Sequence, residues 1–139
     1  MSRRTSREAA MKVLYQIEFH REMDEEGVNA LLADNIGKNM EKQYTEAVCR
    51  EVIKGKHEID SLIEKHLKGW KISRISRVDL TVLRIAVCEM LYFDDIPVSV
   101  SINEAIELTK KYSTPESASF INGVLSSIDK ENNENKEIL

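Results

Sequence analysis

Residues that interrupt helices are scarce in this 139-residue sequence, which has two prolines and five glycines. Cysteine is scarce too, since Cys49 and Cys88 are the only ones, and no segment approaches the roughly 20 consecutive apolar residues of a membrane span. The N-terminus lacks the apolar stretch of a signal peptide. These absences argue against a disulfide framework and a membrane anchor, and they predict long helices and reduced thiols in a cytoplasmic protein.

The composition is that of a globular domain. Hydrophobic residues make up 42% of the chain and charged residues 32%, and 139 residues are enough to bury a core. Apolar residues recur with helical periodicity in six segments, and no segment alternates as a half-buried strand does. We therefore predict an all-α fold, with a single helical domain over residues 1–128 and a disordered acidic tail at 129–139.

Short motifs mark the ends of these helices. Ser76 with Asp79, and Ser101 with Glu104, each match a capping box, and Thr114 is the expected N-cap before the last helix. The first three helices are expected at about residues 3–22, 28–36 and 41–68, the next two follow the capping serines, and the last covers about 115–128.

The first helix begins with three arginines, Arg3, Arg4 and Arg7, although the chain carries a formal charge of −4. Cations at a helix N-terminus oppose the helix dipole, at about 0.3–1 kcal/mol each. Placed 100° apart, the three lie on one stripe beside the core face. Two interpretations remain open: a solvated terminus, or a local patch whose planar guanidinium groups bind phosphate.

Three aromatic residues lie off the expected core faces. Tyr15 and Phe19 are four residues apart on the first helix, and Phe120 projects from the last helix near Glu116. Such residues either fill the edge of the core or form binding surfaces, as protein-contact anchors or as platforms on which bases stack.

Motifs of catalysis are missing. His20, His57 and His66 are scattered, neither cysteine has a partner at zinc-site spacing, and there is no glycine-rich phosphate loop or nucleophile motif. We therefore expect neither an enzyme nor a cofactor or metal site. The central helix carries Arg77 and Arg84, which we expect to pair with an acidic helix such as the one containing Glu104 and Glu107.

The stretches "VLRIA", "INEAIELTKKY" and "FINGVL", within residues 78–128, closely resemble the bacterial antitermination factor family NusB. The opening "RRTSREAAMKVLYQIEF" resembles that family's arginine-rich first helix, and residues 20–70 are similar mainly in helix placement. The resemblance implies two three-helix subdomains packed across each other. We interpret Trp70, the only tryptophan, as a wedge between these halves.

The resemblance also implies a function. NusB proteins bind the single-stranded boxA element of ribosomal-RNA leader transcripts together with the ribosomal protein NusE, in a complex with NusA, NusG and RNA polymerase. By position, the residues expected to contact RNA are Arg3, Arg4, Arg7, Phe120 and Glu116. Those expected to contact NusE are Tyr15, Phe19 and Asp79.

Other functions compete with this one. A helical adaptor that binds only protein is the main alternative, and a homodimer through Tyr15 and Phe19 is compatible with the pattern when NusE is missing. A similar helical domain precedes an RNA cytosine-5 methyltransferase, but this chain has no glycine-rich cofactor loop. A helix-turn-helix DNA-binding protein would need basic and amide residues along a recognition helix, and no later helix has such a face.

Overall fold

The computed structural model describes residues 3–20, 23–38 and 40–138. This part of the chain contains no strand and folds into six α-helices with one 3₁₀ turn: α1 (Arg3–Glu18), α2 (Glu25–Asn35), α3 (Lys42–Lys65), η1 (Ile72–Arg74), α4 (Arg77–Tyr92), α5 (Val98–Tyr112) and α6 (Pro115–Ile138). The all-α prediction is confirmed. None of the helices in these ranges is long and apolar enough to cross a bilayer.

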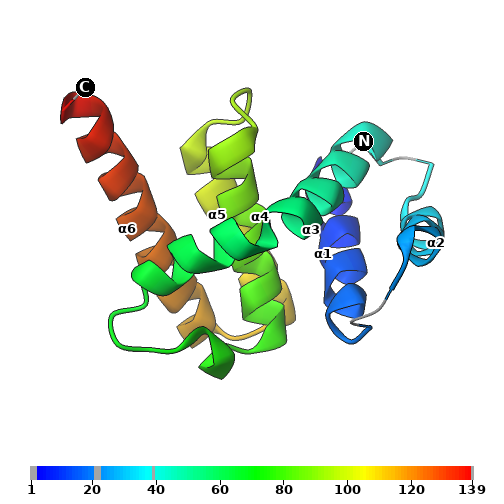
Figure 1. Cartoon of the computed structure of the whole chain (residues 1–139), viewed down its shortest axis with the longest axis horizontal. Helices are drawn as coiled ribbons and strands as arrows, with labels where there is room; N and C mark the ends of the chain where they lie inside the picture. Colours follow the sequence, from blue (N-terminus) through cyan, green and yellow to red (C-terminus); the bar gives the residue numbers. More distant parts are fainter. Residues whose placement is uncertain (1–2, 21–22, 39, 139) are drawn as a thin grey trace.

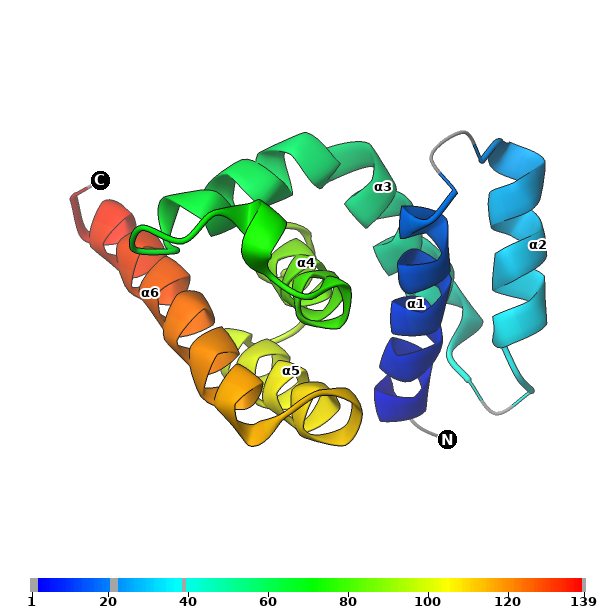
Figure 2. The ribbon, with the colours of Figure 1, turned by 90° about the horizontal axis from the view of Figure 1, so that it is seen from below.

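The helix α4 lies at the centre of the molecule, with α3, α5 and α6 packed around it and α1 against its other side (Figures 1 and 2). The outermost helix, α2, packs on α1. The long α3 contacts α1, α4 and α6, so it connects helices from both ends of the sequence.

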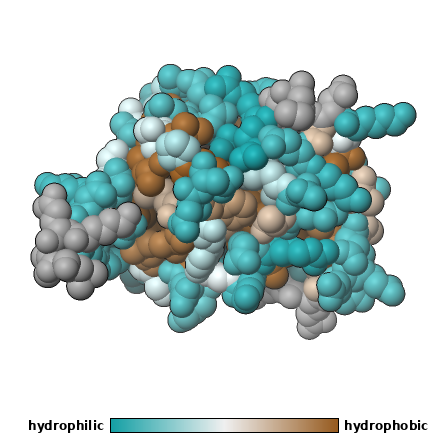
Figure 3. Space-filling model, turned by 90° about the horizontal axis from the view of Figure 1, so that it is seen from above, coloured by the Kyte–Doolittle hydropathy of each residue, from teal (hydrophilic) through white to brown (hydrophobic). Residues whose placement is uncertain are grey.

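The core is continuous across these helices. Its largest fully buried side chains include Ile59 and Ile63 from α3, Leu83 from α4, and Ile121 and Leu125 from α6. Burying one such side chain stabilises the fold by about 1.5–3 kcal/mol. The outer surface is mainly hydrophilic on the face shown in Figure 3, where hydrophobic areas are visible between the polar side chains.

Two helix boundaries differ from the prediction because of local hydrogen bonds. The helix α1 ends at Glu18, where the amides of Phe19 and His20 turn back to carbonyls three residues earlier, at 3.1 and 2.9 Å. The helix α2 begins at Glu25, since the carboxylate of Asp24 accepts a hydrogen bond from the Gly27 amide at 2.9 Å.

The last helix extends to Ile138, well past the predicted end near residue 128. The segment expected to be a disordered tail is helical in the structure. Glu131 explains part of the difference, because its carboxylate oxygens lie 2.5 Å from Lys65 Nζ and 2.5 Å from His66 Nε2 at the end of α3. Ser127 Oγ adds a hydrogen bond of 2.7 Å to His66 Nδ1.

Residues 66–76, here called the connector, link α3 to α4. The connector turns at Lys68 and Gly69, whose φ angles are 50° and 91°. Trp70 is 59% exposed, so the prediction that it forms a wedge between two halves is wrong. Ile72 and Ile75 pack against the core in its place.

Candidate functional site

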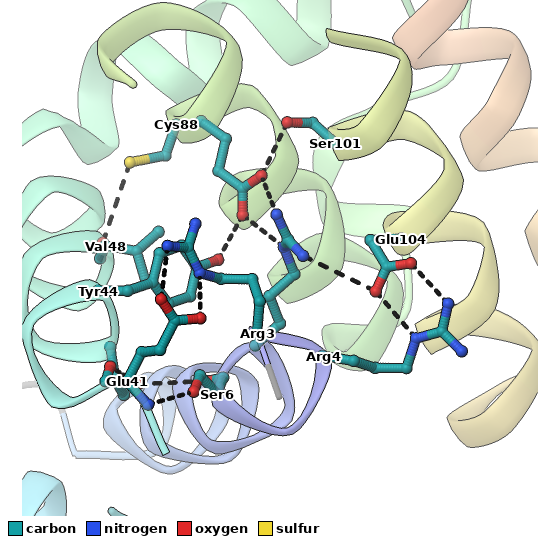
Figure 4. Close-up of polar contacts among 12 residues, drawn as sticks. Arg3, Arg4, Ser6, Glu41, Tyr44, Val48, Cys88, Ser101 and Glu104 are labelled. Carbon is teal, nitrogen blue, oxygen red and sulfur yellow. Dashed lines mark hydrogen bonds and ion pairs between the residues drawn. The ribbon is translucent and has the colours of Figure 1, made fainter. Parts of the chain in front are cut away.

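The first two arginines of α1 are held by two glutamates, Glu41 directly before α3 and Glu104 on α5 (Figure 4). Arg3 donates two hydrogen bonds to the Glu41 carboxylate, at 2.6 and 2.8 Å, and its guanidinium lies 4.3 Å from the centroid of the Tyr44 ring. Arg4 donates two bonds to Glu104, at 2.9 and 2.7 Å. The side chain of Arg4 is 58% exposed and that of Arg3 is 34% exposed.

Arg7 has a different place, inside the protein. Its guanidinium donates two hydrogen bonds, of 2.8 and 3.0 Å, to Glu89, and the two side chains are only 4% and 1% exposed. The hydroxyls of Tyr44 and Ser101 also donate to the Glu89 carboxylate, the second at 2.7 Å. The structure thus places Arg7, predicted to contact RNA, inside the protein, where a buried carboxylate occupies its guanidinium.

Ser101 likewise does not cap α5, because that helix begins at Val98 and the Ser101 hydroxyl is used by Glu89. Thr114 does cap α6, since its hydroxyl accepts from the Ser117 amide at 3.0 Å.

The pKa directions agree with this pairing. Burial, the largest single influence, would lower the pKa of Arg7, but the hydrogen bonds to Glu89 and the nearby charges of Tyr44, Glu89 and Glu104 together hold that pKa above its usual value. Burial, and next the charge of Glu89, raise the pKa of Tyr44. The hydrogen bonds from Arg3 and Arg4 lower the pKa of Glu41 and of Glu104. The three arginines are therefore charged at neutral pH, and so are Glu41 and Glu104.

The arginines thus do not form a free basic patch. Arg3, Arg4 and Glu104 line a shallow depression of about 520 Å³ next to Asp95 and Val100. Cations at the start of α1 are disfavoured by the helix dipole. The negative charge of each paired glutamate offsets this unfavourable interaction.

The two remaining predicted RNA residues lie on the first turns of α6. Glu116 is exposed, and Phe120 is half-buried against the core. An ion pair of 2.6 Å between Lys111 and Glu8 ties the end of α5 to α1. The start of α6 therefore lies on the same side of the molecule as the N-terminal end of α1 (Figure 2).

The predicted partner residues include an exposed aromatic pair. Tyr15 and Phe19 form an edge-to-face contact, with ring centroids 5.0 Å apart, and Phe19 is 48% exposed. The guanidinium of Arg77 lies 4.3 Å from the Phe19 ring centroid. The sequence does not indicate this contact, because nothing in the spacing of residues 19 and 77 shows that α1 and α4 meet there.

Asp79 is buried, at 6% exposure. Its amide donates to Ser76 Oγ at 3.2 Å, which is half of the predicted capping box, while its Oδ1 atom has no hydrogen-bond partner. A buried carboxylate oxygen without a donor costs stability. This oxygen is itself closed off from solvent, so it offers no free acceptor on the surface of the protein.

An open cleft of about 1160 Å³ lies between α1, α2, α3 and α4, lined by Phe19, His20, Arg77 and Arg84 among others. Arg84 donates to Asp60, at 2.8 Å through two nitrogens, and to Glu18 at 2.9 Å. The prediction that Arg84 is a structural ion-pair partner is confirmed, but its partners come from α3 and α1 and not from the helix of Glu104 and Glu107.

The described ranges contain no group of three or more His, Cys, Asp or Glu side chains placed to hold a metal ion. Cys49 and Cys88 are free and buried. Burial raises the pKa of each thiol to about 12, so both are protonated and unreactive at neutral pH.

Comparison with known proteins gives consistent results. The NusB family model matches residues 4–130. The transcription antitermination protein NusB of Acetivibrio thermocellus is 48% identical over 143 residues, which cover 99% of this chain and 99% of that protein. The protein of the same name from Bacillus mycoides is 45% identical and covers 92% of this chain, with 97% of its own length aligned.

Solved structures agree with the sequence relatives. NusB of T. maritima superposes with a TM-score of 0.85 at 37% identity, over 94% of this chain and 92% of that one. A chain from a complex of antitermination factors NusB and NusE with double-stranded RNA has a TM-score of 0.81 at 30% identity, over 93% of this chain and 96% of that one. On these grounds, the chain belongs to the NusB family.

Proposed function

We propose that this chain is a transcription antitermination factor that binds boxA-type single-stranded RNA of ribosomal-RNA leader transcripts together with NusE. The observation that carries the proposal is the 48% identity, over 99% of the chain, to a protein named for antitermination. In the cytoplasm, the RNA-bound heterodimer would support processive transcription with NusA, NusG and RNA polymerase. The function is binding, and it requires no catalytic group.

The aromatic pair and Asp79 support a NusE site. Phe19 offers an exposed apolar ring, and large aromatic side chains dominate the energetics of protein interfaces. Asp79 lies two residues after Arg77, whose guanidinium lies on the Phe19 ring, so we assign Asp79 to the edge of the same contact surface. Tyr15 supports Phe19 through the edge-to-face contact.

The RNA site is proposed at the other end of α1. Arg4 is the most exposed of the three arginines, and Arg3 can reach a phosphate after exchanging Glu41 for it. Phe120 would stack on a base, next to Glu116. Arg7 acts indirectly, as a positioning residue that fixes α1 on α4 through Glu89.

A binding experiment tests the proposal. Fluorescence anisotropy of a labelled boxA RNA should show tighter binding to the chain with NusE than to the chain alone. The same RNA annealed to its complement distinguishes single-stranded recognition from the duplex present in the solved NusB–NusE complex. If NusE binds and neither RNA form does, the chain is the protein-only adaptor instead.

The same aromatic surface can pair with itself when NusE is missing. We propose a homodimer through Tyr15 and Phe19, which analytical ultracentrifugation would detect as a dimer that NusE dissociates. Dimerisation that persists in the Phe19→Asp variant would place the contact elsewhere.

A further inference from the structure

The connector and the helix ends beside it carry a regular series of cations. Lysine or arginine occurs at every third position from 65 to 77, and no aspartate or glutamate lies between residues 65 and 78. These cations are Lys65, Lys68, Lys71, Arg74 and Arg77. Without them the chain of net charge −4 would carry −9, so the connector is a basic island on an acidic protein.

The two cations at the ends of the series are engaged. Lys65 pairs with Glu131 at 2.5 Å, and Arg77 lies on the ring of Phe19. The three cations between them, Lys68, Lys71 and Arg74, are exposed, and none has a carboxylate within ion-pair distance in the described part of the chain. Their charges are therefore available to an anionic ligand.

Trp70 stands among these three cations and is the most exposed large hydrophobic residue in the described ranges, at 59%. The turn at Lys68 and Gly69 directs it outward, and its amide is fixed to the Leu67 carbonyl at 3.2 Å. The φ of 50° at Lys68 is uncommon for a residue with a side chain. The indole is thus held on the surface by an ordered turn.

We propose that Lys68, Trp70, Lys71 and Arg74 form a second surface for single-stranded RNA, separate from the arginines of α1. The indole supplies a face on which a base stacks, and the three cations meet the phosphates on either side. A protein partner fits less well, because protein anchors lie within a ring of packed neighbours that excludes water. Around Trp70 the neighbours are glycine and exposed lysines.

The two surfaces lie at opposite ends of the molecule (Figures 1 and 2). Glu41, which holds Arg3, directly precedes α3, and the connector follows that helix. A helix of 24 residues is about 36 Å long. An RNA long enough to reach both ends would be held at two points, which raises its overall affinity without any new contact.

The proposal rests on the proposed function in one respect, that the ligand is single-stranded RNA. Its test uses the fact that Trp70 is the only tryptophan, so intrinsic fluorescence reports on this surface alone. Short oligouridylate, which has no secondary structure, should quench the Trp70 emission in a saturable and salt-sensitive manner.

Substitutions separate the contribution of the three cations from that of the Trp70 indole. The triple variant Lys68→Gln/Lys71→Gln/Arg74→Gln should lower the slope of log affinity against log salt by about 2, since each phosphate on a single strand contributes about 0.7. The matched control Lys12→Gln/Lys38→Gln/Lys54→Gln makes the same charge change at exposed positions on other elements and should leave the slope unchanged. Trp70→Ala should weaken oligouridylate binding roughly 5- to 150-fold by anisotropy, and Trp70→Phe should retain most of it.

The outcomes are distinguishable. If boxA RNA binds with NusE but oligouridylate leaves Trp70 emission unchanged, the proposal is overturned while the proposed function stands. If oligouridylate quenches Trp70 but NusE does not enhance boxA binding, the connector surface is supported and the proposed function fails. Quenching by oligoglutamate and not by RNA would assign the surface to an acidic protein, and equal losses in the triple variant and its control would also overturn the proposal.

Discussion

Two cationic segments lie at opposite ends of this molecule, and their charges have different fates. At the start of α1, each of the three arginines donates two hydrogen bonds to a glutamate that is distant in sequence. In the connector, the three central cations have no such partner within the described ranges. The number of charges in a segment therefore does not indicate how much charge it offers to a ligand.

The difference follows from where each segment lies. The start of α1 packs beside α3, α4 and α5, and the glutamates that meet it are 38, 82 and 100 residues away in sequence. The planar guanidinium suits such fixed two-point contacts, whereas a lysine ammonium is a flexible, hydrated point charge. In the described ranges no carboxylate lies within ion-pair distance of the three central cations of the connector, two of which are lysines.

The strongest test of this comparison is the buried pair. Arg7→Met leaves the Glu89 carboxylate buried without its cation, and we expect the free energy of unfolding to fall by about 3–5 kcal/mol in urea titrations. The double variant Arg7→Met/Glu89→Leu removes both charges and should recover a large part of that loss. Lys71→Met, in the connector, should change stability by less than about 0.5 kcal/mol.

A loss below about 1 kcal/mol for Arg7→Met, similar to that of an exposed ion pair, would contradict the buried assignment. The start of α1 and the connector would then both be solvated basic segments.

The helices were predictable from sequence because apolar periodicity is a local property, and the Thr114 cap was predictable because Pro115 follows it. The ion pairs between distant residues could not be predicted from the sequence. Ser101 with Glu104 matched a capping box, yet Ser101 bonds Glu89 and Glu104 bonds Arg4, because α5 begins three residues earlier and its neighbours are set by tertiary packing.

The arginines were correctly identified as anomalous, but their partners required the fold. The exposure of Trp70 also required the fold. Its size suggested burial, but the turn at Gly69 and the packing of Ile72 and Ile75 leave its side chain on the surface. Helix α6 extends beyond its segment of apolar periodicity, because Glu131 pairs with Lys65 and His66 at the end of α3.

The second prediction concerns Phe19, whose ring lies against the guanidinium of Arg77. Phe19→Ala removes both the exposed ring and the cation–π contact, and we expect NusE affinity to fall about 10- to 100-fold, as for an interface anchor. Isothermal titration calorimetry would measure it, with unchanged circular dichroism as the control for folding. Phe120→Ala should leave NusE affinity unchanged, and an equal loss there would refute a site at Phe19.

The third prediction concerns Arg3 and Arg4 when their glutamate partners are neutralised. In Glu41→Gln/Glu104→Gln, Arg3 and Arg4 lose their charged partners and become available to phosphates. We expect boxA affinity in the presence of NusE to rise about five-fold, since each exposed ion pair is worth up to about 1 kcal/mol. Glu26→Gln/Glu134→Gln makes the same charge change at exposed sites and should raise affinity by less. No difference between the two double variants would mean that the glutamates do not compete with RNA.

The smallest expected effect is the pH dependence of the Arg4–Glu104 pair. The hydrogen bonds from Arg4 hold the pKa of Glu104 below its ordinary value of 4.5. Because the folded-state pKa is the lower one, the stabilisation is fully present above about pH 4.5 and is lost as the pH falls through the lowered value.

Arg4 is more than half exposed, so solvent screening limits this contribution to about 0.5 kcal/mol. The free energies of unfolding of the parent chain and of Glu104→Gln should differ by that amount at neutral pH and should converge in acid. The Lys71→Gln variant should run parallel to the parent over the same range, because no carboxylate in the described ranges pairs with that lysine. A gap between the parent and Glu104→Gln that persists below pH 4.5 without narrowing would mean that Glu104 contributes through packing and not through its charge.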